Sequence, residues 1–237
     1  MQLFYFICGE KNAVFYYNTL KSTLRMKWPG ITVALLLQLI AVYFFFYREN
    51  GSSNGFVLEN IFSYWHLVSI LCPAAVVFSV LISSDYFSIY TVIRVNNSPY
   101  LTLIYVFKTL LFSAVYGIII MGELYTLCVY NNTGLLYLTP ISFITHVFAF
   151  IFICYVVSFT LLYLNQIIVV FLFILLFLID YLLCNGMLFL NGFVLEFSDL
   201  AELLLFRLGI MLLLFGISIE SIKRRNYLQQ VEEKGAN

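Results

Sequence analysis

The sequence predicts an all-α polytopic membrane protein with six transmembrane helices, an N-terminal amphipathic interfacial helix and both termini in the cytoplasm. Of its 237 residues, 63% are hydrophobic, and the charged residues fall almost entirely between long apolar runs. A soluble fold of this size could not bury so much Leu, Phe, Ile and Tyr. A stretch of about 20 apolar residues crosses a hydrocarbon core roughly 30 Å thick. Six stretches are predicted to do so: Ile31–Tyr47, Ile61–Ser83, Leu101–Tyr130, Ile141–Leu164, Ile167–Cys184 and Leu203–Ile219.

The segment before the first span predicts a helix that lies on the membrane surface. Between Asn12 and Pro29, apolar side chains recur at steps of three and four residues, opposite Lys21, Arg25 and Lys27. Such a pattern is typical of an interfacial amphipathic helix, and we expect residues 1–30 to form one on the cytoplasmic side.

The six spans predict a single transmembrane domain over residues 1–222. They show no sequence repeat, which argues against an internally duplicated secondary transporter. Residues 223–237 form a short polar tail, predicted to be an interfacial end or disordered. On the outer side, residues 185–202 separate the last two spans.

The distribution of Lys and Arg predicts the orientation. With the N-terminus in the cytoplasm, ten of the twelve cations lie inside and only Arg48 and Arg207 lie near the outer face. This bias follows the positive-inside rule and agrees with an even number of spans. The ten inner cations are Lys11, Lys21, Arg25, Lys27, Arg94, Lys108, Lys223, Arg224, Arg225 and Lys234.

The chain lacks the motifs of several catalytic classes. It has no P-loop, no H-E-x-x-H pair and no nucleophile elbow, so no enzymatic activity of its own is expected. His66 and His146 begin different spans, and the five Cys are isolated, so no metal or cofactor site is expected. The net charge of zero gives no indication of nucleic-acid binding.

Three residues within the spans are candidates for a transport pathway. A carboxylate in the membrane costs roughly 2.5–3.5 kcal/mol on insertion scales, so Glu123 and Asp180 each need a partner, a cavity or the interface. Glu123 lies about 33 Å along its helix from Leu101 and is expected near the outer surface. Asp180 lies beyond the midplane and is the better candidate for a partner-bonded or functional acid. Pro73 predicts a kink in the second span, serving either gating or packing.

Small residues at helical spacing predict faces where helices approach closely, within this chain or across a dimer. Ser79 lies between Ala75 and Ser83 on such a face of the second span. Gly209 and Gly216 lie seven residues apart on the last span, and Ser113 and Gly117 lie four apart on the third.

The loop between the second and third spans resembles the corresponding stretch of ABC-2 type transporter permeases. In that family an acid at the end of the second span leads into a short helix. A break of small residues and proline follows, and then a third span with an early lysine. Here Asp85 matches the acid, Ile89–Val95 the helix, Asn96–Pro99 the break and Lys108 the lysine. The serine precedes the proline in this chain, whereas the family usually has the reverse order. The family also has short re-entrant helices between its last two spans on the outer side, so the resemblance implies a re-entrant segment over residues 185–202, where Gly, Asn and Ser interrupt an apolar stretch.

This resemblance implies the permease subunit of an ATP-driven exporter in the cell membrane. Two permeases, identical or homologous, would form the pathway, and two separate ATPase subunits would bind ATP and Mg on the cytoplasmic side. The coupling helix would contact the ATPase, with Arg94 in a polar contact and Asp85 anchoring the loop; both are alternatively ordinary interfacial charges. The predicted coupling residues are Asp85, Ile89, Arg94, Ser98, Pro99 and Lys108.

Family precedent favours an amphipathic cargo such as a peptide, lipid or drug. The 25 Phe and 18 Tyr suit an apolar wall, although aromatics are common in any polytopic protein. The amino-acid usage is typical of AT-rich Gram-positive bacteria, in which small permeases often export antimicrobial or cytolytic peptides or confer immunity to them. Two alternatives stay open: a secondary transporter or channel, and a membrane scaffold subunit without transport.

Overall fold

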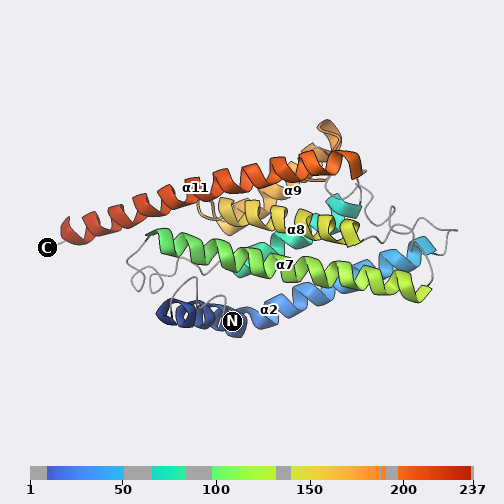
Figure 1. The fold of residues 1–237 in the computed structure, drawn as a ribbon, viewed down its shortest axis with the longest axis horizontal. Coiled ribbons are helices and arrows are strands. Elements are labelled where there is room, and N and C mark those ends of the chain that lie inside the picture. The colour runs from blue at the N-terminus through green and yellow to red at the C-terminus, as the bar shows by residue number, and fades with distance from the viewer. Residues whose placement is uncertain are drawn as a thin grey trace.

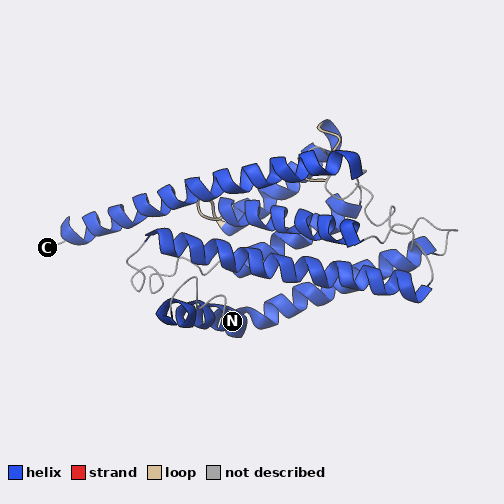
Figure 2. Ribbon diagram, viewed as in Figure 1, coloured by secondary structure: helices blue, strands red, loops and turns tan. Residues whose placement is uncertain are grey.

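The computed structural model describes residues 10–50, 66–83, 98–131, 140–186, 188–190 and 197–235, and these residues form an elongated bundle of helices (Figures 1 and 2). The described chain contains no strand. The helices are α2 (Glu10–Asn50), the π-helical turn η1 (Leu67–Leu71), α5 (Cys72–Ser83), α7 (Ser98–Asn131), α8 (Pro140–Thr160), α9 (Gln166–Leu183) and α11 (Phe197–Gly235).

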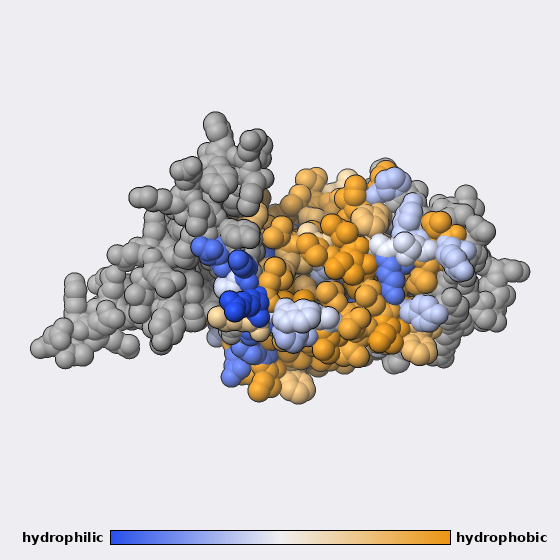
Figure 3. Space-filling view, turned by 90° about the horizontal axis from the view of Figure 1, so that it is seen from below, coloured by the Kyte–Doolittle hydropathy of each residue, from blue (hydrophilic) through white to orange (hydrophobic). Residues whose placement is uncertain are grey.

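Five of these helices are long and apolar enough to cross a membrane, which makes this a multi-pass membrane protein. The apolar segments are Lys21–Phe44, Thr102–Leu127, Pro140–Thr160, Gln166–Leu183 and Ala201–Glu220. A further apolar helical segment, Leu67–Ser83, is shorter. In the space-filling view, apolar side chains form a broad belt with hydrophilic side chains on either side of it (Figure 3).

The first helix differs from the sequence-based prediction. An interfacial helix ending at Pro29 and a separate first span were expected, but α2 is continuous from Glu10 to Asn50 with Pro29 inside it. The direction of α2 changes along its length, as its darker and lighter parts in Figure 1 show. A proline removes one helical hydrogen bond and is typical of such a bend. Because Pro29 is exposed, solvent or lipid headgroups can bind the carbonyl that it leaves without a donor.

The predicted kink at Pro73 corresponds to a local change of helix type. Pro73 is the second residue of α5, directly after η1, and the N–H of Cys72 donates to the carbonyl of Leu67. Since Pro73 has no N–H, the ordinary ladder is interrupted here and a π-helical turn precedes the proline. Residues 61–65 of the predicted second span lie outside the described residues.

Helix α8 lies at the centre of the bundle, between α7, α5 and α11 (Figure 1). A cluster of aromatic rings joins three helices: the ring centroid of Tyr116 in α7 lies 4.4 Å from that of Phe78 in α5, in a stacked pair, and 5.7 Å from that of Phe150 in α8, in an edge-to-face pair. Gly117 permits close approach of α7 and α8, since a Cβ there would lie 3.3 Å from the Cα of Val147.

The last helix is longer than predicted. Helix α11 runs from Phe197 to Gly235, so most of the polar tail continues the last apolar helix and is not disordered. An interfacial position of this tail stays a prediction. Residues such as Lys, Arg, Gln and Glu are strong helix formers. They extend an existing helix without a new nucleation step, which is the costly part of helix formation.

Candidate functional site: two buried polar junctions

Of the six predicted coupling residues, three lie outside the described residues and three lie in α7. Asp85, Ile89 and Arg94 lie outside the described residues. Ser98 and Pro99 are the first two residues of α7, where proline is well tolerated because its missing N–H has no helical partner. Lys108 lies nine residues after Pro99 in α7, and its side chain is buried.

A cluster of hydroxyl groups joins the helices that flank this loop. The hydroxyl of Ser83, the last residue of α5, lies 2.9 Å from that of Ser158 in α8. The hydroxyl of Tyr105 in α7 donates to the main-chain carbonyl of Ser158. All three side chains are buried. We call this group the serine clamp; it ties the end of α5 and the start of α7 to the same residue of α8.

The cavity beside the serine clamp is very small. Its lining includes Tyr105, Thr109, Ser158 and Ser218, and its volume is about 10 Å³. A cavity of that size holds at most one water molecule. It provides no room for cargo, so it is not a transport pathway within one chain.

A second junction is centred on the buried side chain of Asp180, near the end of α9. Its carboxylate accepts hydrogen bonds from the backbone N–H groups of Leu188, Phe189 and Leu190, at 2.9, 2.9 and 3.2 Å. Its main-chain carbonyl accepts from the N–H groups of Cys184 and Gly186. The side chain of Asp180 is 0% exposed.

The chain reverses direction directly after Asp180. Asn185 and Gly186 have φ angles of 49° and 78°, the left-handed conformation that Gly and Asn adopt at the ends of helices. The reversal returns Phe189 to the aromatic rings of α9, 5.4 Å from Phe177 and 6.1 Å from Phe173. Of the predicted re-entrant segment, residues 187 and 191–196 lie outside the described residues.

Arg207 of α11 completes this junction. Its guanidinium donates to the carbonyl of Phe189 at 2.8 Å and lies 4.9 Å from the ring centroid of Phe152 in α8. Its side chain is 1% exposed. Phe189 therefore donates its N–H to Asp180 and accepts from Arg207, so a single residue connects the two opposite charges. We call this set the Asp180–Arg207 junction; it connects α9, the folded-back turn, α8 and α11.

The Asp180–Arg207 junction has the chemistry of a contact that holds helices together, not that of a ligand-binding site. Both carboxylate oxygens of Asp180 already accept main-chain N–H groups, which is how a buried charge is satisfied. The described residues contain no group of three or more His, Cys, Asp or Glu side chains suited to a metal ion.

The other predicted pathway and packing residues have different surroundings. The hydroxyl of Ser79 bonds the carbonyl of Ala75 in its own helix at 2.7 Å. One carboxylate oxygen of Glu123 is buried, with no hydrogen-bond partner among the described residues. A Cβ added at Gly209 or Gly216 would meet no atom of the described chain within 4 Å. Packing of these two glycines across a dimer stays a prediction.

Sequence reasoning missed several residues of the two junctions. Arg207 was taken only as a charge near the outer face, and neither Tyr105 nor Ser158 was singled out. Gln38 was also missed: its side chain is 2% exposed, and its amide atoms have no hydrogen-bond partner among the described residues. A single amide within the apolar run 31–47 was the signal that could have identified it.

Comparison with known proteins gives no further identification. No family model, curated protein or solved structure matches this chain.

Proposed function

We propose that this chain is a permease subunit of an ABC-type exporter in the cell membrane. The observation that carries the proposal is the serine clamp on either side of loop 84–97. The loop connects α5 to α7, and the clamp ties the adjoining parts of both helices to Ser158 of α8. The proposal also draws on the resemblance of this loop to the coupling region of ABC-2 permeases.

The proposed topology has six spans. The apolar segment Leu67–Ser83 is the second of them. Both termini then lie in the cytoplasm, as the Lys and Arg distribution favours. Loop 84–97 is on the cytoplasmic side in this arrangement, where an ATPase subunit can reach it.

The proposed mechanism is mechanical coupling. A partner ATPase binds ATP and Mg, and its closure displaces the helix Ile89–Val95. Because the hydrogen bonds of the serine clamp join α5, α7 and α8 toward the loop, the displacement moves these helices together rather than bending one of them. Arg94 makes the polar contact with the ATPase and Asp85 anchors the loop.

The proposed pathway lies between two permease subunits. The cavity beside the serine clamp is too small for cargo, and a second copy or a homologue would supply the other wall of the conduit. The exposed surface of the helices is rich in Leu, Ile and Phe, which suits an amphipathic peptide, lipid or drug. Export of an antimicrobial or cytolytic peptide, or immunity to one, is the leading candidate.

The test is purification from native membranes in mild detergent, followed by an ATPase assay. We expect a stoichiometric ATPase partner whose activity is lost or uncoupled in the Arg94→Glu variant. Arg48→Glu is the matched control, because it reverses the same charge at the far end of α2. Absence of any ATPase, or equal effects of both substitutions, would contradict the proposal.

One observation favours a second candidate, a secondary transporter or channel. The Asp180–Arg207 junction places two opposite charges within apolar helices, as ion-coupled transporters do. However, both carboxylate oxygens of Asp180 are occupied by main-chain donors. Transport into vesicles that depends on a proton or sodium gradient, without ATP, would favour this candidate over the permease.

A further inference from the structure

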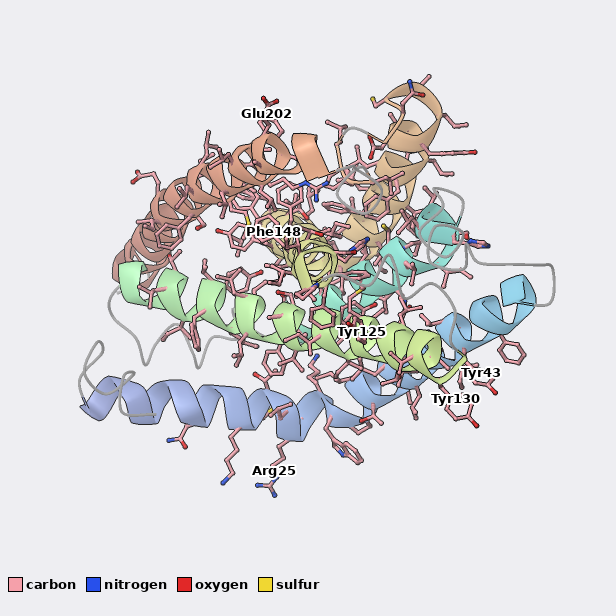
Figure 4. All side chains as sticks on the ribbon, turned by 45° about the vertical axis from the view of Figure 1, so that its right-hand side comes forward. Arg25, Tyr43, Tyr125, Tyr130, Phe148 and Glu202 are labelled. Atoms are coloured by element: carbon pink, nitrogen blue, oxygen red, sulfur yellow. The ribbon has the colours of Figure 1, made fainter. Side chains whose placement is uncertain are left out.

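The last helix, α11, has two buried side chains among those that the structure describes, and both are polar. Within residues 201–220 of α11, only Arg207 and Ser218 are buried, at 1% and 2% exposed. They lie eleven residues apart, which is about three turns, so both occupy the same face of the helix. Glu202 is exposed and points away from the other helices in Figure 4. Arg207 belongs to the Asp180–Arg207 junction, and Ser218 lies at the cavity beside the serine clamp.

This cavity has a polar lining, although it lies between apolar helices. Five of its eight lining residues carry a hydroxyl group: Tyr105 and Thr109 of α7, Tyr155 and Ser158 of α8, and Ser218 of α11. All five side chains are at most 5% exposed. Empty cavities in proteins are apolar, whereas a polar cavity of about 10 Å³ has room for the centre of one water molecule.

The hydroxyl groups at the cavity have hydrogen-bonding capacity that the chain itself does not use. The hydroxyls of Thr109 and Tyr155 have no hydrogen-bond partner among the described residues. The hydroxyl of Ser218 donates to the carbonyl of Phe215 at 2.8 Å, so its oxygen can still accept a hydrogen bond. Burying a hydroxyl without a partner is costly, and a water that bonds these groups removes that cost. The lining carries no charged side chain, so the ligand that it suits is neutral.

We propose that this cavity binds one ordered water molecule. The water accepts from the hydroxyls of Thr109 and Tyr155 and donates to the oxygen of Ser218, and three hydrogen bonds are usual for a buried water. It thereby links α11 to α7 and α8, next to the hydrogen bond between Ser83 and Ser158. Polar links of this kind matter in lipid, where apolar surface alone gives helices little reason to associate. The site is independent of the proposed transport function.

The first test is hydroxyl-radical labelling of the full chain in lipid nanodiscs, by X-ray radiolysis and mass spectrometry. Radicals formed from a bound water react with the side chains beside it, even where bulk water does not reach. We expect Tyr105 and Tyr155 to be labelled several-fold faster than Tyr116 of α7. Tyr116 is the reference because it is 1% exposed and does not line the cavity.

A cavity-filling variant tests the source of the labelling. Ser218→Val replaces the hydroxyl with two methyl groups, which occupy the cavity and displace the water. The labelling of Tyr155 should then fall to that of Tyr116. Ser113→Val is the matched control, because Ser113 is buried, bonds the carbonyl three residues earlier as Ser218 does, and lies outside the cavity. It should leave the labelling unchanged.

Thr109→Val gives a second readout, through the sign of the change in stability. The substitution keeps the shape of the side chain and removes its hydroxyl. With the water bound, we expect the equilibrium constant of unfolding in mixed micelles to rise about five-fold, the contribution of one typical hydrogen bond. In a dry cavity the same substitution removes an unpartnered hydroxyl and lowers that constant. Thr126→Val is the control, since its exposed hydroxyl bonds only its own helix, and should change the constant by less than about two-fold.

Three results would overturn the proposal. The first is equal labelling of Tyr155 and Tyr116 in the parent chain. The second is unchanged labelling of Tyr155 in Ser218→Val, which would place the source of the radicals in bulk water. The third is a lower unfolding constant in Thr109→Val, which would show that the cavity is dry, and this variant keeps the test informative if Ser218→Val does not fold.

Discussion

The Asp180–Arg207 junction leads to a graded prediction for the stability of the bundle. In Asp180→Ala, three main-chain N–H groups lose their acceptor; the bond from Leu190 is buried and those from Leu188 and Phe189 are partly buried. A buried donor left without a partner costs about 1–3 kcal/mol, and a partly buried one costs less because water can reach it. We expect Asp180→Ala to lower the free energy of unfolding by about 4 kcal/mol in all.

Asp180→Asn should have an intermediate effect. The amide keeps one oxygen, which can accept from both Phe189 and Leu190, while its NH₂ group then faces the N–H of Leu188. One donor is left without an acceptor, so the expected loss is about 1–3 kcal/mol. Glu123→Gln is the matched control, since one of its carboxylate oxygens has no hydrogen-bond partner among the described residues. Its expected change is below about 1 kcal/mol.

The assay is reversible unfolding in mixed dodecyl maltoside and SDS micelles, followed by circular dichroism. A double-mutant cycle with Arg207→Met tests whether the two charges act through Phe189. Because that residue bonds both side chains, we expect the two losses to be non-additive by at least about 0.5 kcal/mol. Equal stabilities of parent, Asp180→Asn and Asp180→Ala would refute the reasoning, and strict additivity would refute the shared role of Phe189.

Three further predictions concern the rest of the bundle, and the same unfolding assay tests each of them. Ser158→Ala should lower stability by about 1–2 kcal/mol because the buried hydroxyl of the clamp loses its partner; an unchanged value would contradict the clamp. Gln38→Leu should raise stability by about 1–2 kcal/mol because it removes a buried amide without a described partner, and a loss would show that the amide is bonded. Gly117→Ala should lower stability by about 1–3 kcal/mol because the added methyl meets Val147. The control Gly122→Ala, with no atom within 4 Å, should be neutral or stabilising, and equal losses in both variants would refute the close approach.

The membrane character and the positions of several helices follow directly from the sequence. The predicted spans Ile141–Leu164 and Ile167–Cys184 agree with α8 and α9 to within four residues at each end. This agreement has a physical cause, since an apolar run of that length can satisfy its backbone in a bilayer only as a helix. The turn between the two helices is set by Asn165, whose side chain accepts from the N–H of Ile167 as an N-cap.

Contacts between helices were beyond sequence reasoning. The partners Ser83 and Ser158 are 75 residues apart, and their meeting depends on how two helices rotate about their axes. Where apolar residues surround every face of a helix, periodicity does not fix that rotation. The small residues of α5 indicated a packing face, but the partner helix was not evident.

The surroundings of Asp180 show how the nearby sequence can indicate the hydrogen-bond partner of an acid within an apolar span. An acid within an apolar span predicts a partner, and the natural expectation is a cation on another helix. The structure provides main-chain N–H groups instead, which become available because the chain reverses at Asn185 and Gly186. Arg207 reaches the acid only through the peptide groups of Phe189. An Asn-Gly pair shortly after an intramembrane acid therefore points to a folded-back segment as its hydrogen-bond donor, and to a cation that stabilises the segment rather than the acid itself.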